Sequence, residues 1–294
     1  MSTPTSICAI ATPVAPAALG MIRASGHLCA HIFPGLTPRV ATVRSYTTLA
    51  GQFLDQIVAV YFADKKSFTG EASLEITCHG NPFILQKILE DLLARGFTLA
   101  QPGEFTRRAF LNGKLDLTQA EAIASLIAAQ SDRALESAHR QLAGELGDTL
   151  RKFSEQLISL IAAVEATIDF PEEDVPAHLP ASEKFNTLIT QLSALQRTHR
   201  AHTLTFQGAR IALIGAPNAG KSSLFNSLLA HERALVSPIA GTTRDYLEAR
   251  LYLGPHLVTL VDTAGLNPAT DAQSIEALGI QKTHEQLSTA DLIL

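Results

Sequence analysis

Short β-like runs and one helical segment alternate over roughly the first 115 residues. The runs 56–62 and 72–78 are rich in apolar and β-branched residues, which is typical of strands. A helix is predicted near 83–95, and Gly96 directly after it is a normal stop signal. This pattern predicts an α+β domain over residues 1–117.

The pattern becomes helical from Thr118. Residues 118–121, Thr-Gln-Ala-Glu, have the form of a capping box, which satisfies the first free N–H groups of a helix. Apolar residues then recur at spacings of three, four and seven, which predicts one stripe on a single long helix: Leu135, Leu142, Leu146, Leu150, Phe153, Leu157, Ile161, Val164 and Ile168. After three prolines a second helix is predicted to run to about Thr205. We expect a helical middle region over 118–207, with both stripes used for packing.

The third zone, 208–294, has the pattern of an α/β domain. Residues 210–214 form a short apolar run suited to a buried parallel strand. Residues 223–229 continue as an amphipathic helix. Two further strands are predicted to turn at Gly254-Pro255, and the last five residues read as the opening of another strand.

A complete phosphate-binding loop, G-A-P-N-A-G-K-S, joins the first strand and helix of this zone. Gly215 and Gly220 allow consecutive backbone N–H groups to turn around a phosphate, at the positive end of the following helix. Lys221 reaches the β and γ phosphates, and the Ser222 hydroxyl takes a place on Mg²⁺. With a strand before it and a helix after it, the loop predicts a nucleoside triphosphatase.

Two other segments indicate a switch GTPase. Asp262 follows an apolar strand and begins D-T-A-G, which places a carboxylate near the Mg²⁺ sphere. The backbone N–H of Gly265 can sense a γ-phosphate. The segment 241–243, Gly-Thr-Thr, offers a hydroxyl that can join Mg²⁺. Together with the loop, these segments predict GTP as the nucleotide.

Two residues of the nucleotide site are unusual. Leu266 stands where small GTPases commonly carry a water-orienting Gln, so either hydrolysis is negligible or another group serves. Asp271 and Glu276 are the carboxylates in the stretch that follows. The Asn218 side-chain oxygen can hold a cation beside the phosphates. The alternative for Asn218 is a residue that stabilises the turn.

Composition narrows the class of protein. The 294 residues include no Trp, which suits a helix-rich soluble protein. Their net charge is −5, so any contact with nucleic acid needs a local basic patch or a partner. Cys8, Cys29 and Cys78 lack metal-ligand spacing, so we expect reduced thiols. The apolar stretch 7–22 contains two prolines and follows no Lys or Arg, so it is interpreted as strand and loop. We expect no membrane span and a cytoplasmic location.

With these residues in view, the chain resembles the MnmE (TrmE) family of tRNA-modification GTPases over nearly its whole length. Outside the nucleotide motifs the resemblance is carried by RASG at 23–26, FTGE at 68–71, CHG at 78–80, PGEFT at 102–106 and RRAFLNGKLDLTQAEA at 107–122. It implies a multidomain fold: an N-terminal α+β folate-binding-like domain, part of a helical domain, and a partial P-loop α/β GTPase domain. The guanine-reading N-K-x-D motif would lie beyond Leu294.

The resemblance also implies a folate site. The N-terminal domain would dimerise and bind 5-formyltetrahydrofolate, or a related reduced folate, as one-carbon donor. The matching residues are Arg23, Glu75 and Lys114. Arg23 and Lys114 suit the glutamate tail of folate, and Glu75 can accept from a pterin N–H. Without the resemblance, each would be taken as a surface ion-pair residue.

For the nucleotide site, the resemblance implies K⁺ bound by Asn218, Ser237, Ile239 and Thr242, and Mg²⁺ bound by Ser222 and Thr243. Ser237 and Ile239 would act through backbone carbonyls. Glu276 would be the catalytic residue that orients water. The implied GTP-binding residues are Asn218, Ala219, Gly220, Lys221, Ser222, Ser223, Ser237, Pro238, Ile239, Ala240, Gly241, Thr242, Thr243, Asp262, Thr263, Ala264 and Gly265.

The function that the resemblance implies is K⁺-stimulated GTP hydrolysis in tRNA modification. A homodimer would work with a partner, MnmG, on the wobble uridine of certain tRNAs, adding a 5-carboxymethylaminomethyl-type group with a folate-derived carbon. One alternative is a ribosome-assembly or signalling switch GTPase, which would not carry the PGEFT and RRAFLNGK blocks. Another is a folate-binding module whose incomplete nucleotide domain has no GTPase activity.

Overall fold

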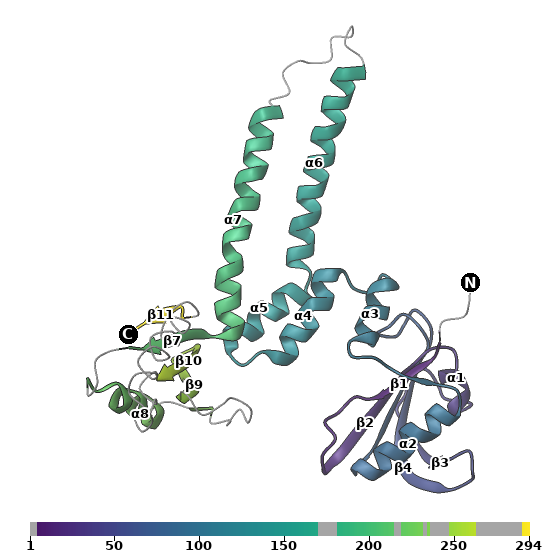
Figure 1. Cartoon of the computed structure of the whole chain (residues 1–294). Coiled ribbons are helices and arrows are strands. Elements are labelled where there is room, and N and C mark those ends of the chain that lie inside the picture. Colours follow the sequence, from purple (N-terminus) through teal and green to yellow (C-terminus); the bar gives the residue numbers. More distant parts are fainter. Residues whose placement is uncertain (1–4, 170–180, 215–218, 232–233, 236–246, 263–289) are drawn as a thin grey trace, which may run out of the picture. The chain divides into compact units, whose positions relative to one another are not determined.

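The structure is a computed structural model that describes residues 5–169, 181–214, 219–231, 234–235, 247–262 and 290–294 (Figure 1). It divides into two compact units, Met1–Ala120 and Glu121–Leu294. The predicted multidomain fold, with α+β, helical and α/β parts, is confirmed.

The first unit is built on a six-stranded sheet in the order β3-β4-β5-β2-β1-β6. Neighbouring strands are antiparallel except β1 and β6, which are parallel. The elements are β1 (Ile7–Ile10), β2 (Ala17–Ser25), α1 (Cys29–Ile32), β3 (Thr42–Thr47), β4 (Phe53–Phe62), β5 (Ser73–Gly80), α2 (Pro82–Ala94), β6 (Thr98–Leu99) and α3 (Glu104–Leu111). The two strands and the helix that the hydrophobic pattern predicts are β4, β5 and α2.

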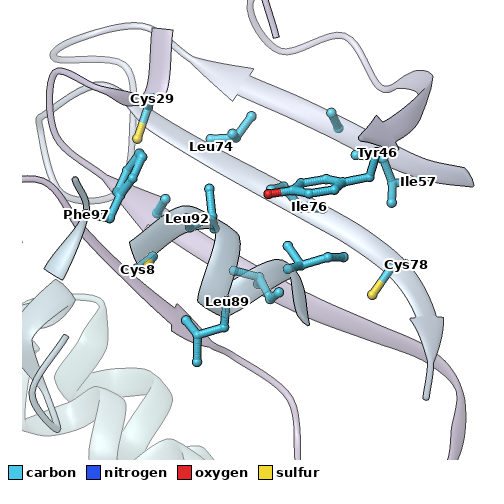
Figure 2. Packing of buried hydrophobic residues seen from close by; sticks show 14 of the residues in the cluster. Cys8, Cys29, Tyr46, Ile57, Leu74, Ile76, Cys78, Leu89, Leu92 and Phe97 are labelled. Carbon is cyan, nitrogen blue, oxygen red and sulfur yellow. The ribbon is translucent and has the colours of Figure 1, made fainter. Parts of the chain in front are cut away.

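The core of this unit lies between one face of the sheet and helix α2. Side chains alternate along β4, so Ile57 and Ala59 are buried while Val58 between them is exposed. Figure 2 shows Leu89 and Leu92 of α2 among the apolar side chains of the sheet. Other members of the cluster are Cys8, Ile22, Cys29, Leu74, Ile76, Cys78, Leu85, Ile88 and Phe97. The opposite face of the sheet therefore remains available for other contacts.

Helix α2 begins and ends with the residues that its geometry needs. The Asn81 side chain caps the helix by accepting from the Phe83 N–H at 2.8 Å, and Pro82 occupies the first turn, where no N–H partner is needed. Gly96 has a φ of +96°, the left-handed conformation common after a helix C-terminus. The predicted stop at Gly96 is confirmed.

Helix α4 (Leu117–Ala128) starts earlier than the predicted capping box allows. The Asp116 carboxylate accepts from the Gln119 N–H at 2.8 Å, and the Gln119 side chain accepts from the Asp116 N–H at 3.0 Å. The capping box is thus Asp116–Gln119, and the prediction of Thr118–Glu121 was wrong. An aspartate two residues upstream takes the cap position, and the Thr118 hydroxyl donates to it at 2.7 Å.

The long apolar stripe belongs to two helices, α5 (Asp132–Leu142) and α6 (Glu145–Asp169), so the prediction of a single helix was wrong. Gly144 has a φ of +93°, and its N–H donates to the carbonyl of Gln141. This left-handed glycine ends α5. The stripe hides this break because Leu142 and Leu146, on either side of it, keep helical spacing. The second predicted helix is α7 (Ala181–Gln207), which packs on α6.

The second unit also contains a five-stranded sheet in the order β11-β7-β10-β9-β8. Its elements are β7 (Ala209–Leu213), α8 (Lys221–His231), β8 (Ala234–Leu235), β9 (Leu247–Leu253), β10 (His256–Asp262) and β11 (Leu292–Ile293). Strand β7 is parallel to β10 and β11, and the other pairs are antiparallel. The predicted strand, helix and hairpin turn are confirmed.

A buried polar cluster in the first unit joins β3 to α2. The Asp91 carboxylate accepts from the Tyr46 hydroxyl at 2.8 Å, the Leu49 N–H at 2.8 Å and the Arg95 Nε at 2.6 Å. Burial by itself would raise the pKa of Asp91, but the bonds from Leu49, Arg95 and Tyr46 outweigh burial and lower it. The ionised carboxylate therefore stabilises the folded unit.

We expect Asp91→Asn to lower the free energy of unfolding of the first unit by about 2 kcal/mol at neutral pH, because charged hydrogen bonds are lost. The Asp91 pKa is lower in the folded chain, so its contribution is complete above the unfolded value near 3.8 and is lost as the pH falls through the folded value. Urea denaturation at neutral and acidic pH measures this loss. Exposed Asp64→Asn is the control. Equal acid sensitivity of wild type and Asp91→Asn would contradict the assignment.

Candidate functional site

Arg23, Glu75 and Lys114, which are far apart in the sequence, line one cavity of about 420 Å³ in the first unit. They are the three residues predicted to bind folate, and the structure brings all of them together. The other lining residues are Arg39, Phe62, Lys65, Lys66, Ser67, Phe68, Thr69 and Ser73. The cavity has the size of a small-molecule site.

Arg23 and Glu75 form an ion pair across two neighbouring strands. They stand directly opposite each other on β2 and β5. The Arg23 Nε and Nη2 donate to Glu75 Oε1 at 3.0 and 2.6 Å, and the guanidinium carbon lies 5.7 Å from the centre of the Phe68 ring. Oε2 of Glu75 has no hydrogen-bond partner among the described groups, so it can accept from a ligand N–H. The ion pair also reduces the charge that Arg23 can offer to an anion.

Lys114 follows α3 and is held against the loop 65–70. Its Nζ donates to the carbonyl of Lys65 at 3.0 Å. Gly70 has a φ of +78°, and a Cβ there would lie 3.2 Å from Lys114 Cγ and 3.0 Å from Asn112 Cβ. Glycine is the residue best suited to this position for both reasons. The Asn112 amide closes the contact by donating to the Thr69 carbonyl at 2.7 Å.

Sequence reasoning missed three cations of this cavity, Arg39, Lys65 and Lys66. Arg39 lies between β3 and the helix before it, and its Nη2 donates to the carbonyl of Lys66 at 2.9 Å. Outside the resemblance blocks, a lysine or arginine in a loop carries no sequence signal other than its charge. With them the lining has five cations and one carboxylate, an electrostatic environment that favours an anion.

A partly buried polar network anchors the loop that forms one wall of the cavity. Glu71 Oε2 accepts from the Ser25 hydroxyl at 2.8 Å and from Arg108 Nη1 at 3.0 Å. Arg108 also donates to Glu104 at 2.8 Å, and the Ser67 hydroxyl donates to the Glu71 carbonyl. These contacts tie the loop to β2 and α3, and every charge in the network has a partner.

In the second unit, the described nucleotide-site residues lie after β7 and at the end of β10. Ala219 and Gly220, whose φ is +91°, precede α8, and Lys221, Ser222 and Ser223 form its first turn. Because β7 and β10 are parallel with Leu213 opposite Asp262, their carboxyl ends meet at one edge of the sheet. This is where nucleotides bind in such sheets.

The other predicted residues of the nucleotide site lie outside the described part of the chain: Asn218, Ser237, Pro238, Ile239, Ala240, Gly241, Thr242, Thr243, Thr263, Ala264, Gly265 and Glu276. Of the predicted Mg²⁺ and K⁺ ligands, Ser222 alone is described. Within the described ranges, no three His, Cys, Asp or Glu side chains come together as a metal site. The helices described there include none that is long and apolar enough to cross a membrane.

Comparison with known proteins decides the family. A model described as the N-terminus of the GTP-binding protein TrmE matches residues 6–114, and a model of the MnmE helical domain matches residues 117–292. The chain is 47% identical to the tRNA modification GTPase MnmE of Opitutus terrae, over 98% of this chain and 65% of that protein. The chain belongs to the MnmE (TrmE) family.

Other MnmE relatives agree in extent. The proteins of Wolinella succinogenes and Aquifex aeolicus are 41% and 43% identical, over 100% and 98% of this chain and 66% of each relative. The chain therefore spans about two thirds of the length of the MnmE proteins it matches. The TrmE N-terminal match contains the cationic cavity, and the MnmE helical match extends from α4 to β11.

In this MnmE family member, we expect Glu71→Ala to loosen the loop 65–70. The variant removes the acceptor of Ser25 and Arg108, and the Lys65 N–H, which bonds to the Gly70 carbonyl at 3.1 Å, should exchange its hydrogen about tenfold faster. Hydrogen exchange with mass spectrometry measures the effect, with exposed Glu90→Gln as control. If hydrogen exchange over the loop 65–70 is unchanged in the variant, the Glu71 network does not hold this loop in place.

Proposed function

We propose that this chain binds a reduced folate and GTP as part of a K⁺-stimulated GTPase that modifies tRNA. The observation that carries the proposal is the meeting of Arg23, Glu75 and Lys114 in one cationic cavity. The family resemblance implies a role in folate binding for these same three residues. They come from β2, β5 and the segment after α3, so local sequence does not explain their meeting.

The chemistry of the cavity fits 5-formyltetrahydrofolate or a related folate. A pterin needs an acceptor for its ring N–H groups, which Glu75 Oε2 supplies, and an aromatic surface, which Phe68 supplies. The glutamate tail needs a cation, which Lys114 supplies. In this arrangement Arg23 mainly orients Glu75 and adds positive charge beside the ring.

For the nucleotide we propose GTP, bound where α8 begins. Backbone N–H groups of residues 219–223 surround the phosphates, and Lys221 contacts their outer oxygens. Mg²⁺, held by Ser222 and Thr243, would neutralise charge on the β and γ phosphates when bound. Asn218, Ser237, Ile239 and Thr242 are proposed as K⁺ ligands. Glu276 is proposed to orient the attacking water, because Leu266 cannot.

The activity of the whole protein is proposed from its family. Its relatives are named tRNA modification GTPases. We extend that name to this chain, with the wobble uridine as target, a folate-derived carbon, MnmG as partner and a cytoplasmic location. The proposed domains are 1–117 for folate binding and dimerisation, 118–207 for the helical part and 208–294 for the GTPase part.

We expect an Arg23→Ala plus Lys114→Ala variant to bind 5-formyltetrahydrofolate about 10- to 100-fold more weakly, because it loses the charged contact of Lys114 and the ion pair by which Arg23 orients Glu75. Isothermal titration calorimetry measures the affinity. Lys87→Ala, on the exposed side of α2, is the matched control and should bind like wild type. Equal affinity of wild type and the double variant would remove both residues from the site.

We expect GTP hydrolysis to be roughly 10- to 100-fold faster in K⁺ than in Na⁺ at constant ionic strength, because a bound cation would stabilise charge that develops between the phosphates. Asn218→Ala should abolish the difference. Asn186→Ala, on exposed α7, should retain it. A K⁺ response that survives in Asn218→Ala would refute the proposed cation site.

A further inference from the structure

The folate cavity has more positive charge than its own side chains neutralise. Arg23 pairs with Glu75, but among the described residues Arg39, Lys65, Lys66 and Lys114 form no ion pair with a carboxylate. Arg39 and Lys114 donate instead to backbone carbonyls. A carbonyl orients a cation without cancelling its charge, so four positive charges remain for a ligand.

Two of these cationic residues have an unfavourable, left-handed backbone conformation. Arg39 has a φ of +64° and Lys65 a φ of +60°, and in the described ranges they are the non-glycine residues with positive φ. Their backbone N–H groups bond to the carbonyls of Tyr61 and Gly70, at 2.8 and 3.1 Å, contacts that a glycine would keep. Glycine is the residue best suited to this conformation. Strained residues of this kind collect at functional sites.

The charge exceeds what the simplest folate needs. A folate with one glutamate has two tail carboxylates, whereas each further γ-linked glutamate adds one more. Four cations therefore match a tail of about three glutamates. The lining also contains Phe62, Phe68 and Glu75 within a hollow of about 420 Å³, which suits a small ligand with an aromatic ring better than an RNA backbone.

We propose that this cavity selects reduced folates with a poly-γ-glutamate tail, and that Arg39, Lys65 and Lys66 determine that specificity. The three side chains bind the additional carboxylates, while Lys114 binds the first glutamate. This inference rests on the proposed folate site and adds the form of folate that the site takes. Solvent-exposed charge pairs are weak singly, so several are needed for useful selection.

The test compares 5-formyltetrahydrofolate carrying one and three glutamates by calorimetry on the whole chain. We expect the triglutamate to bind roughly 5- to 20-fold more tightly, since each exposed pair contributes about 2- to 5-fold. The ratio should fall as salt rises. Arg39→Gly plus Lys65→Gly should lower the ratio to the contribution of Lys66 alone, about 2- to 5-fold at most, with little change for the monoglutamate. Lys66→Ala alone should lower it in part, and Lys87→Ala should not change it.

The glycine variants separate binding from folding, because glycine is favoured at both positions. Their melting temperature should equal or exceed that of wild type. Equal wild-type affinity for the two ligands would overturn tail selection and leave folate binding intact, whereas binding of neither would overturn both. If the double glycine variant keeps the wild-type ratio of triglutamate to monoglutamate affinity, Arg39 and Lys65 do not select the tail. Weaker tRNA binding by that variant, with an unchanged folate ratio, would assign these cations to RNA.

Discussion

The register between β2 and β5 is the constraint on which the cationic cavity depends. Ile22 lies opposite Ile76, both fully buried beneath α2, and the next pair is Arg23 opposite Glu75. Adjacent pairs in an antiparallel sheet point to opposite faces, so burial of the isoleucines places the ion pair on the other face. A slip of one residue would force Arg23 into the core, where an unpaired charge is strongly disfavoured. Core packing therefore positions the charged pair.

The wall opposite this pair depends on polar contacts. In the loop 65–70 the buried side chains, Ser67 and Thr69, are polar. The loop also holds cations close together, and their mutual repulsion opposes folding. Glu71 offsets this by accepting from Ser25 and Arg108 at the base of the loop. Gly70 allows the close approach of Lys114. The paired charges beneath the cavity thus stabilise the fold. Apart from Arg23, the cations that line the cavity form no ion pair with a described carboxylate and destabilise the fold, but they remain free to bind a ligand.

Sequence patterns predicted the elements better than the places where they end. The strand Ala209–Leu213 and the helix Lys221–His231 on either side of the predicted phosphate-binding loop follow from local residues, and the structure contains both. Gly144 and Asp116 show the limit: the apolar stripe continues past a glycine that ends a helix, and an aspartate outcompetes a nearby threonine as cap. The family resemblance predicted Arg23, Glu75 and Lys114 as site residues. Arg39 and Lys65 could not be predicted as site residues, because the local sequence does not show which loops line the same cavity.

The two sites should consequently respond differently to substitution. The carboxyl ends of β7 and β10 meet because the two parallel strands are in register. Damage to the nucleotide site proposed there should therefore come mainly from changes in the loop and helix that follow β7. The cationic cavity is assembled from β2, β5, the loop 65–70 and the segment after α3. A residue such as Arg108, which does not line the cavity, holds that assembly together. Substitutions outside the cavity are therefore expected to alter the affinity of the proposed folate site through geometry, while the proposed nucleotide site should depend mainly on its own loop and helix.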